Sequence, residues 1–107
     1  MTKHDDAMRV WTFLCERYPD NTFTLHRHCH GDYSISWHAH SLGGVENLLE
    51  EIGFDMRECR DCGGIEGENL VVCKAVRAKL RLDVLYTHKH GAALPAWFAD
   101  AMEGEAA

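Results

Sequence analysis

Three cysteines and a histidine in the second half of the chain are of types that bind metal ions. Cys59 and Cys62 are separated by two residues and followed by a Gly-Gly pair. In zinc knuckles two thiolates at this spacing chelate the metal, and glycines permit the tight turn beneath it. The chain has no second Cys-x-x-Cys, so Cys73 and a histidine such as His88 would have to complete the four ligands. We predict this set as one alternative, with zinc as its cofactor; the other is three reduced thiols in or near a loop.

A second set of metal-binding types lies in the histidine-rich segment, residues 22–40, which holds five of the eight histidines. His26 and His28 precede a Gly-Asp pair, and His38 and His40 follow it. Four neutral imidazoles in one patch could bind a divalent ion. The alternative is that they are surface polar residues, since the strand pairing we expect sets histidine opposite serine or threonine rather than histidine.

Catalytic signatures are absent from the sequence. Cys29 lies between His28 and His30, but neighbours on a strand point to opposite faces, so we do not expect a nucleophile-base pair. The chain contains no nucleophile-elbow, zinc-protease, Walker or dinucleotide-binding motif. We therefore predict a protein that is not an enzyme.

The histidine-rich segment itself has the pattern of a β-hairpin. Apolar and polar side chains alternate along both arms, and the Gly-Asp pair supplies turn residues between them. A three-residue loop at 30–32 sets Leu25 opposite Trp37 and His26 opposite Ser36, whereas a two-residue loop would pair apolar with polar side chains. We choose the three-residue loop. It predicts one apolar face for the core and one solvent face of Thr, Ser and His.

Helical patterns stand on either side of this hairpin. Asp5 or Asp6 is the expected N-cap of a first helix that runs to about Tyr18, before a proline. Apolar residues at helical spacing predict a second helix, capped by Ser41 and ended by Gly53.

The remaining segments predict strands and one more helix. We expect a short strand at 54–59 and a strand over 80–87, where apolar residues alternate. The run 70–77 is too apolar all round to separate strand from helix. A proline near its start predicts a short helix at 95–102.

These elements do not alternate as in a parallel doubly wound sheet, so we predict an α+β fold: a mainly antiparallel β-sheet with two to three helices packed on one face. At 107 residues the chain is the size of one domain. That single domain comprises the histidine-rich hairpin 22–40, an acidic helix and Cys-Gly loop 41–68, C-terminal strands 70–88 and the short terminal helix 95–102.

Composition and charge narrow the class of function. Five cysteines without a secretory signal favour reduced thiols and a cytoplasmic protein, and no apolar run is long enough for a membrane span. The formal net charge of −6 argues against direct nucleic-acid binding, because such binders neutralise phosphates.

Acidic residues concentrate from Glu46 to Glu68, in the second predicted helix and the segment that follows it. The interaction residues that we predict are Glu46, Glu50, Glu51, Asp55 and Glu58, together with the hairpin residues His26, His28, His38 and His40. An ordinary solvated surface would show a similar pattern.

Our leading hypothesis is a small acidic protein-interaction module without a cofactor, an inhibitor or regulator that occludes a surface on a larger protein partner. A nucleic-acid-handling complex would offer a basic groove, as for anti-CRISPR or anti-restriction proteins. The alternative is a structural or weakly hydrolytic zinc-binding module. Self-association to a homodimer is also compatible with the histidine face, and acidification would then build like charge there and separate the copies.

Overall fold

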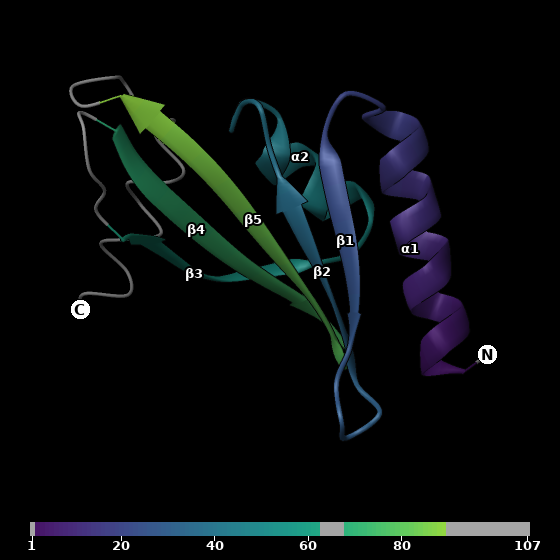
Figure 1. Ribbon diagram of the computed structural model, residues 1–107. Coiled ribbons are helices and arrows are strands. Elements are labelled where there is room, and N and C mark those ends of the chain that lie inside the picture. The colour runs from purple at the N-terminus through teal and green to yellow at the C-terminus, as the bar shows by residue number, and fades with distance from the viewer. Residues whose placement is uncertain (1, 63–67, 90–107) are drawn as a thin grey trace.

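Seven helices and strands make up the part of the chain that the computed structural model describes, residues 2–62 and 68–89 (Figure 1). In chain order they are α1 (Lys3–Arg17), β1 (Thr22–Arg27), β2 (Tyr33–His38), α2 (Val45–Glu51), β3 (Asp55–Asp61), β4 (Glu68–Arg77) and β5 (Leu80–Lys89). The predicted α+β fold is confirmed. The helix expected at 95–102 lies outside the described residues.

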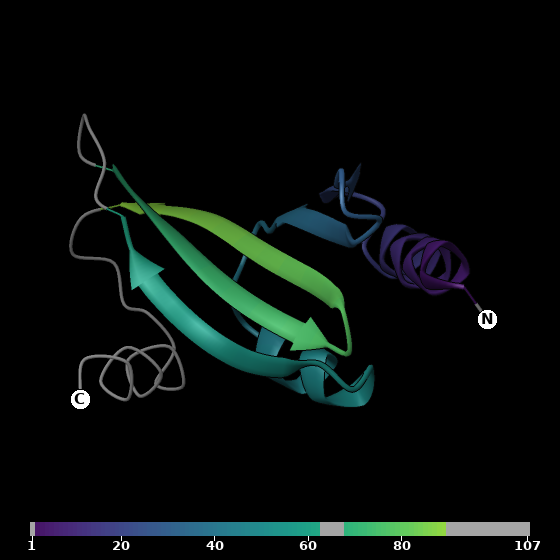
Figure 2. The ribbon, with the colours of Figure 1, turned by 90° about the horizontal axis from the view of Figure 1, so that it is seen from below.

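The five strands form one sheet in the order β1-β2-β5-β4-β3. Three of the four pairings are antiparallel, and β2 pairs with β5 in parallel. This central parallel pairing joins the N-terminal hairpin to the C-terminal strands. Figure 2 shows α1 beside the β1–β2 hairpin and α2 beside the first residues of β3.

One hydrophobic core lies between the helices and one face of the sheet. Strand alternation places its sheet residues on that face, and both helices contribute to the same cluster. The largest fully buried side chains are Trp37, Leu14, Ile35, Leu82, Val45, Val71, Val84, Cys59 and Cys73. The indole N–H of Trp37 donates to the Asn21 side-chain oxygen at 2.9 Å, so this ring is buried without an unsatisfied donor.

Helix α1 begins three or four residues earlier than the sequence predicts. Thr2 is the N-cap and its hydroxyl accepts from the Asp5 N–H at 3.1 Å, so the expected cap at Asp5 or Asp6 is wrong. Both aspartates lie in the first turn instead, where their charge interacts favourably with the helix dipole. Tyr18 ends the helix as predicted.

Helix α2 has a hydrogen-bonded C-terminal cap but no side-chain cap at its N-terminus. Gly44 is the N-cap, without a side-chain cap bond, and Ser41 instead accepts from the Gly43 N–H, so the predicted Ser41 cap is wrong. Gly53 follows the helix with a φ of 79°. Its N–H donates to the Glu50 carbonyl at 3.1 Å and the Phe54 N–H to the Leu49 carbonyl at 2.8 Å, which is a Schellman motif. The predicted stop at Gly53 therefore turns the chain sharply into β3.

The hairpin forms, but its register differs by two residues from the predicted one. Phe23 rather than Leu25 lies opposite Trp37, and His26 lies opposite Ser34. The loop spans 28–32, because the His28 N–H donates to the Asp32 carbonyl at 2.8 Å and closes a longer turn. A shift of two residues leaves every side chain on its predicted face, so the apolar and polar faces are those expected.

The segment 70–77, for which the sequence could not separate strand from helix, is a strand. Residues 70–77 belong to strand β4, which pairs along its length with β5. Ala78 and Lys79 make the short connection between them, with Ala78 at a φ of 54°. Strand β3 runs past the expected end at Cys59 to Asp61 and has a bulge at Arg57.

Candidate functional site

Three of the predicted acidic residues surround one cleft, named here the acidic cleft. Glu46, Leu49 and Glu50 project from one side of α2, because residues three and four apart share a helix face. The Schellman turn then brings Phe54, Asp55 and Met56 to the same place. The cleft has a volume of about 280 Å³ and is lined by Glu46, Leu49, Glu50, Gly53, Phe54, Asp55 and Met56.

The floor of the acidic cleft is apolar and fixed, while its rim is charged. Leu49 and Phe54 are almost fully buried and Met56 is half-buried, whereas Glu46, Glu50 and Asp55 are exposed. Within the described residues, neither glutamate has an ion pair. Asp55 has only a long contact with Arg57, 3.9 Å between its Oδ2 and the Nη2. The rim thus carries three negative charges with little compensation.

Arg77 contacts Phe54, one of the residues that line the acidic cleft. Its guanidinium lies 5.1 Å from the centre of the Phe54 ring and donates to the Ile52 carbonyl at 2.8 Å. The same group donates to Asp6 of α1 at 2.6 Å. The positive charge of Arg77 is therefore already paired, and the turn that shapes the cleft is tied to α1.

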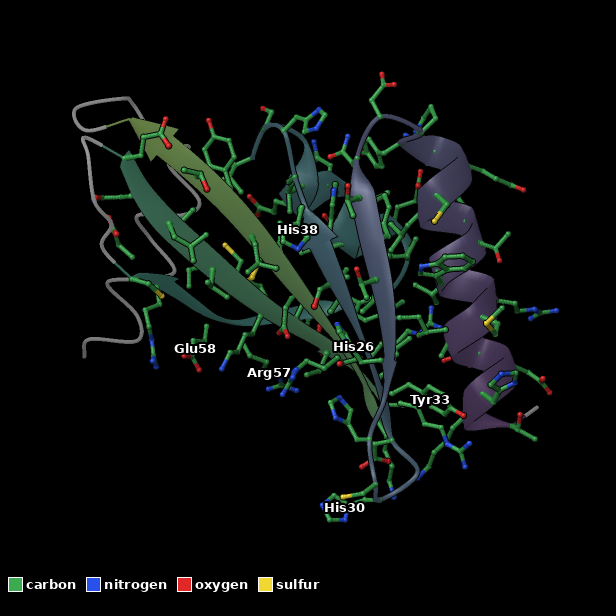
Figure 3. The ribbon with its side chains drawn as sticks, viewed as in Figure 1. His26, His30, Tyr33, His38, Arg57 and Glu58 are labelled. Atoms are coloured by element: carbon green, nitrogen blue, oxygen red, sulfur yellow. The ribbon has the colours of Figure 1, made fainter. Side chains whose placement is uncertain are left out.

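The other two predicted acidic residues lie elsewhere. Glu51 faces α1, with its Oε2 at 3.7 Å from the Arg17 Nη1. Glu58 lies past the β3 bulge and accepts from Arg60 at 2.6 Å. Figure 3 shows Glu58 and Arg57 on β3. The structure therefore brings together Glu46, Glu50 and Asp55 and separates Glu51 and Glu58 from them.

The four hairpin histidines do not form one patch. His26 contacts the Ser36 hydroxyl at 3.2 Å and His28 the Ser34 hydroxyl at 2.8 Å, whereas His38 lies four residues along the hairpin from the His26 level. At ~3.3 Å per strand residue this is a separation of roughly 13 Å. His26 and His38 stand well apart in Figure 3. His40 follows the end of β2 and lines a separate cleft with His38.

The cysteines predicted to bind zinc are split between two faces. Cys59 and Cys73 lie directly opposite each other on β3 and β4 and are buried in the core. Cys62 is exposed, and its odd spacing from Cys59 along an extended chain directs it away from the core. Among the described residues no group of three or more His, Cys, Asp or Glu side chains is placed to hold a metal ion.

The Cys-x-x-Cys segment is thus extended where a zinc knuckle needs a tight turn. His88 is part of β5, and its side chain lies outside what the structure describes. The zinc set stays a prediction, which metal analysis of untagged protein would test.

The neighbouring thiols of Cys59 and Cys73 affect each other's chemistry. A hydrogen bond with the Cys59 side chain and burial both raise the pKa of Cys73 far above its usual range. Burial also raises the pKa of Cys15. Cys73 is therefore a neutral core thiol at physiological pH, with low reactivity.

The expectation that Cys29 and its neighbouring histidines lie on a strand and point to opposite faces is wrong. Cys29 and His30 lie in the hairpin loop rather than on a strand, and the Cys29 Sγ is 3.7 Å from the His30 Nε2. Both are exposed, and both line a cleft of about 340 Å³ at the hairpin tip. No sequence signal could have found this contact, because the extent of the loop is set by the backbone hydrogen bond between His28 and Asp32.

Serine, histidine and aspartate also meet on the open face of the sheet, in an order unsuited to a catalytic triad. Ser36 contacts His26 on one side and lies opposite Asp83 on the other. A triad needs the histidine between the other two, oriented by the carboxylate. Asp83 instead accepts from Arg81 at 3.2 Å, and its Oδ1 is buried without a partner among the described residues.

Comparison with known protein families, curated proteins and solved structures finds no match. No helix in residues 2–62 and 68–89 is long and apolar enough to cross a membrane.

Proposed function

We propose that this protein is a non-catalytic interaction module whose acidic cleft binds a lysine or arginine side chain of a protein partner. The observation that carries the proposal is the convergence of Glu46, Glu50 and Asp55 around an apolar floor. Long cationic side chains combine an aliphatic stem with a charged head. The stem fits the floor of Leu49 and Met56, and the head meets the rim.

The arrangement is unfavourable for the helix itself, which supports a role in binding. Glu46 and Glu50 are four residues apart, a spacing at which like charges repel. Glu50 also lies near the C-terminal, negative end of the helix dipole, and the last turn holds no basic residue. A cation from a partner would relieve both repulsions.

The partner that this chemistry favours is a protein with a basic groove. Grooves that hold nucleic-acid phosphates are lined by Lys and Arg, so an acidic module with a net charge of −6 is complementary to them. Occupying such a groove would exclude the nucleic acid. The protein would then act as an inhibitor or regulator of a nucleic-acid-handling complex.

Fluorescence anisotropy with a labelled Lys/Arg-rich peptide tests the cleft. One variant carries Glu46→Gln, Glu50→Gln and Asp55→Asn. Its matched control carries Glu16→Gln, Asp20→Asn and Glu51→Gln, which removes the same charge at exposed positions outside the cleft. The control loses one exposed ion pair, of the kind that contributes little stability.

We expect the cleft variant to lose about tenfold or more in affinity, since hydrogen bonds to charged groups contribute ~1.5–3 kcal/mol. Its affinity should also depend less on salt than that of the wild type. The control should bind nearly as the wild type. Equal losses in both variants would mean that only overall charge matters, and would remove the cleft from the proposal.

A further inference from the structure

A small cavity lies where the first turn of α1 meets the sheet, and it is named here the α1 cavity. The start of β2, the β4–β5 connection and the start of β5 form its other walls, at the lower end of the molecule in Figure 1. It has a volume of about 260 Å³ and is lined by Lys3, Asp6, Tyr33, Ala78, Lys79 and Leu80. None of these residues lines the acidic cleft, so the two sites are separate.

The sheet side of the α1 cavity is apolar. Tyr33 on β2 and Leu80 on β5 lie opposite each other in the parallel pairing, and both side chains are on the face that α1 covers. Leu80 is buried and Tyr33 is half-buried, with its ring pointing from the hairpin toward α1 in Figure 3 and centred 5.7 Å from the ring of His4. A dry cavity of ~150 Å³ is enough to hold benzene, so one aromatic ring fits here.

Two ion pairs hold the walls of the α1 cavity together. The Lys3 ammonium donates to the Asp32 carboxylate at 2.9 Å and ties α1 to the β1–β2 loop. Asp6 accepts from Arg77 at 2.6 Å, which ties the same turn of α1 to the end of β4. The cavity is thus formed before a ligand arrives, and binding costs less ordering of side chains than it would in a loose site.

The charges around the α1 cavity favour an anionic ligand. Lys3 and Asp6 are already paired, with Asp32 and Arg77. Lys79 has no ion pair with any described residue, and its charge lowers the pKa of Asp32 only after the hydrogen bond and the charge of Lys3. The lining residues and their partners therefore comprise three positive and two negative side chains, and the ammonium of Lys79 is the one left for a ligand.

The backbone beside Lys79 is held in a strained conformation. Ala78 and Lys79 alone connect β4 to β5, and Ala78 has a φ of 54°, which costs an L-residue energy. Strained residues of this kind cluster at binding sites. The short connection keeps Lys79 next to Leu80, so a cation lies directly beside the apolar wall of the cavity.

We propose that the α1 cavity binds a small carboxylic acid whose apolar body is about the size of one aromatic ring. The apolar body packs on Tyr33 and Leu80, and the carboxylate accepts a hydrogen bond from the Lys79 ammonium. The inference does not rest on the acidic cleft, so either proposal can fail without the other.

NMR titration of the full chain with benzoate tests the site, with benzyl alcohol, benzylamine and acetate as comparison ligands. The affected variant is Lys79→Met, which removes the charge and keeps an apolar stem. Its matched control is Lys74→Met, which makes the same change on the other face of the sheet, because the flanking Cys73 and Ala75 are buried in the core. Spectra of the free variants check that each is folded.

We expect saturable benzoate shifts localised at Tyr33, Ala78, Lys79 and Leu80. The affinity for benzoate should fall about fivefold in Lys79→Met, the upper end of what an exposed ion pair contributes, and stay unchanged in Lys74→Met. Benzyl alcohol should bind more weakly than benzoate, with the same affinity in the wild type and in Lys79→Met. Benzylamine should also bind more weakly than benzoate, and acetate should not saturate.

Four results would overturn the proposal. The first is the absence of localised shifts with benzoate. The second is acetate binding as tightly as benzoate, which would remove the ring from the site. The third is benzylamine binding at least as tightly as benzoate, which would remove the preference for an anion. The fourth is the same benzoate affinity in Lys79→Met and Lys74→Met, which would remove Lys79 from the site.

Discussion

Glu50 combines a cost in stability with a place on the rim of the acidic cleft. It lies four residues after Glu46 and close to the C-terminal end of α2, where a negative charge is disfavoured. Residues retained for binding are often suboptimal for folding. The two effects can be separated by one conservative substitution.

Glu50→Gln should therefore stabilise the protein and weaken its binding to a basic peptide. Relief of the like-charge pair is worth about 0.2–0.5 kcal/mol, measured as an increase in the free energy of unfolding in urea. Glu51→Gln, on the side that faces Arg17, is the control and should show no loss of binding. A less stable Glu50→Gln protein would show that this carboxylate has a structural contact instead.

The cysteines should differ in reactivity according to burial. Cys29 and Cys62 are exposed, whereas Cys59 and Cys73 are buried. The pKa of the Cys73 thiol is raised by its hydrogen bond with the Cys59 side chain and by burial. Iodoacetamide at neutral pH should modify Cys29 and Cys62 in the folded protein and Cys59 and Cys73 only after unfolding, because the thiolate is the reactive form. Mass spectrometry of the digested protein gives the order. Early modification of Cys73 would contradict the buried pair.

The Lys3–Asp32 ion pair should contribute to stability in a pH-dependent way. Hydrogen bonding to Lys3 lowers the pKa of Asp32 from its usual 3.8, so folding is favoured while Asp32 is ionised. This contribution is complete above the unfolded-state pKa and disappears as the pH falls through the lower, folded-state value. Lys3→Met should thus be less stable than the wild type near neutral pH, and the difference should vanish in acid. A difference that persists at low pH would assign the effect of Lys3 to packing.

At the scale of elements, the side-chain pattern predicts faces better than it predicts registers. Period-two alternation placed Trp37 in the core and His26 outside, and both are found there. The same faces survive a shift of two residues, so alternation could not choose between the predicted loop at 30–32 and the observed one at 28–32. That choice depends on the backbone bond between His28 and Asp32.

The ends of the helices are likewise only partly predictable from the sequence. Gly53 is identifiable as a helix stop because glycine alone adopts its φ without cost. Thr2, Asp5 and Asp6 are all good N-caps, and only the three-dimensional contact with the Asp5 N–H distinguishes Thr2.

The β4–β5 connection offers a direct test of backbone strain. Ala78 has a φ of 54°, which costs an L-residue roughly 1–2 kcal/mol. Ala78→Gly removes that cost and adds unfolded-chain entropy of ~0.5–1 kcal/mol, so we expect a net gain in unfolding free energy of up to about 1 kcal/mol. Lys79→Gly is the matched control: Lys79 has no positive φ, so it should lose stability. A loss in both would show that Ala78 is unstrained.

At the scale of the whole molecule, sequence reasoning reached the fold class but not the topology. The alternating and helical segments were sufficient for an α+β sheet with helices on one face. The parallel pairing of β2 with β5 joins segments that are more than forty residues apart, as with Ile35 opposite Leu82, and local patterns carry no signal for it.

The candidate site was predicted in part for the same reason. The density of acidic residues in the sequence predicted five interaction residues. Only three of them lie together, because the turn after α2 brings Asp55 beside Glu46 and Glu50. Glu51 falls on the opposite side of the short helix and Glu58 lies past the bulge of β3. The cleft at the hairpin tip was missed, because it forms only when the β1–β2 loop meets the β4–β5 connection.

The most direct test of the acidic cleft is a two-dimensional NMR titration of the wild-type chain with the Lys/Arg-rich peptide. If the cleft binds a cationic side chain, the largest chemical-shift changes will lie at Glu46, Leu49, Glu50, Asp55 and Met56, and they will diminish with added salt. The hairpin tip should remain unaffected. Shift changes spread evenly over all acidic residues, Glu16 and Glu51 included, would contradict the account.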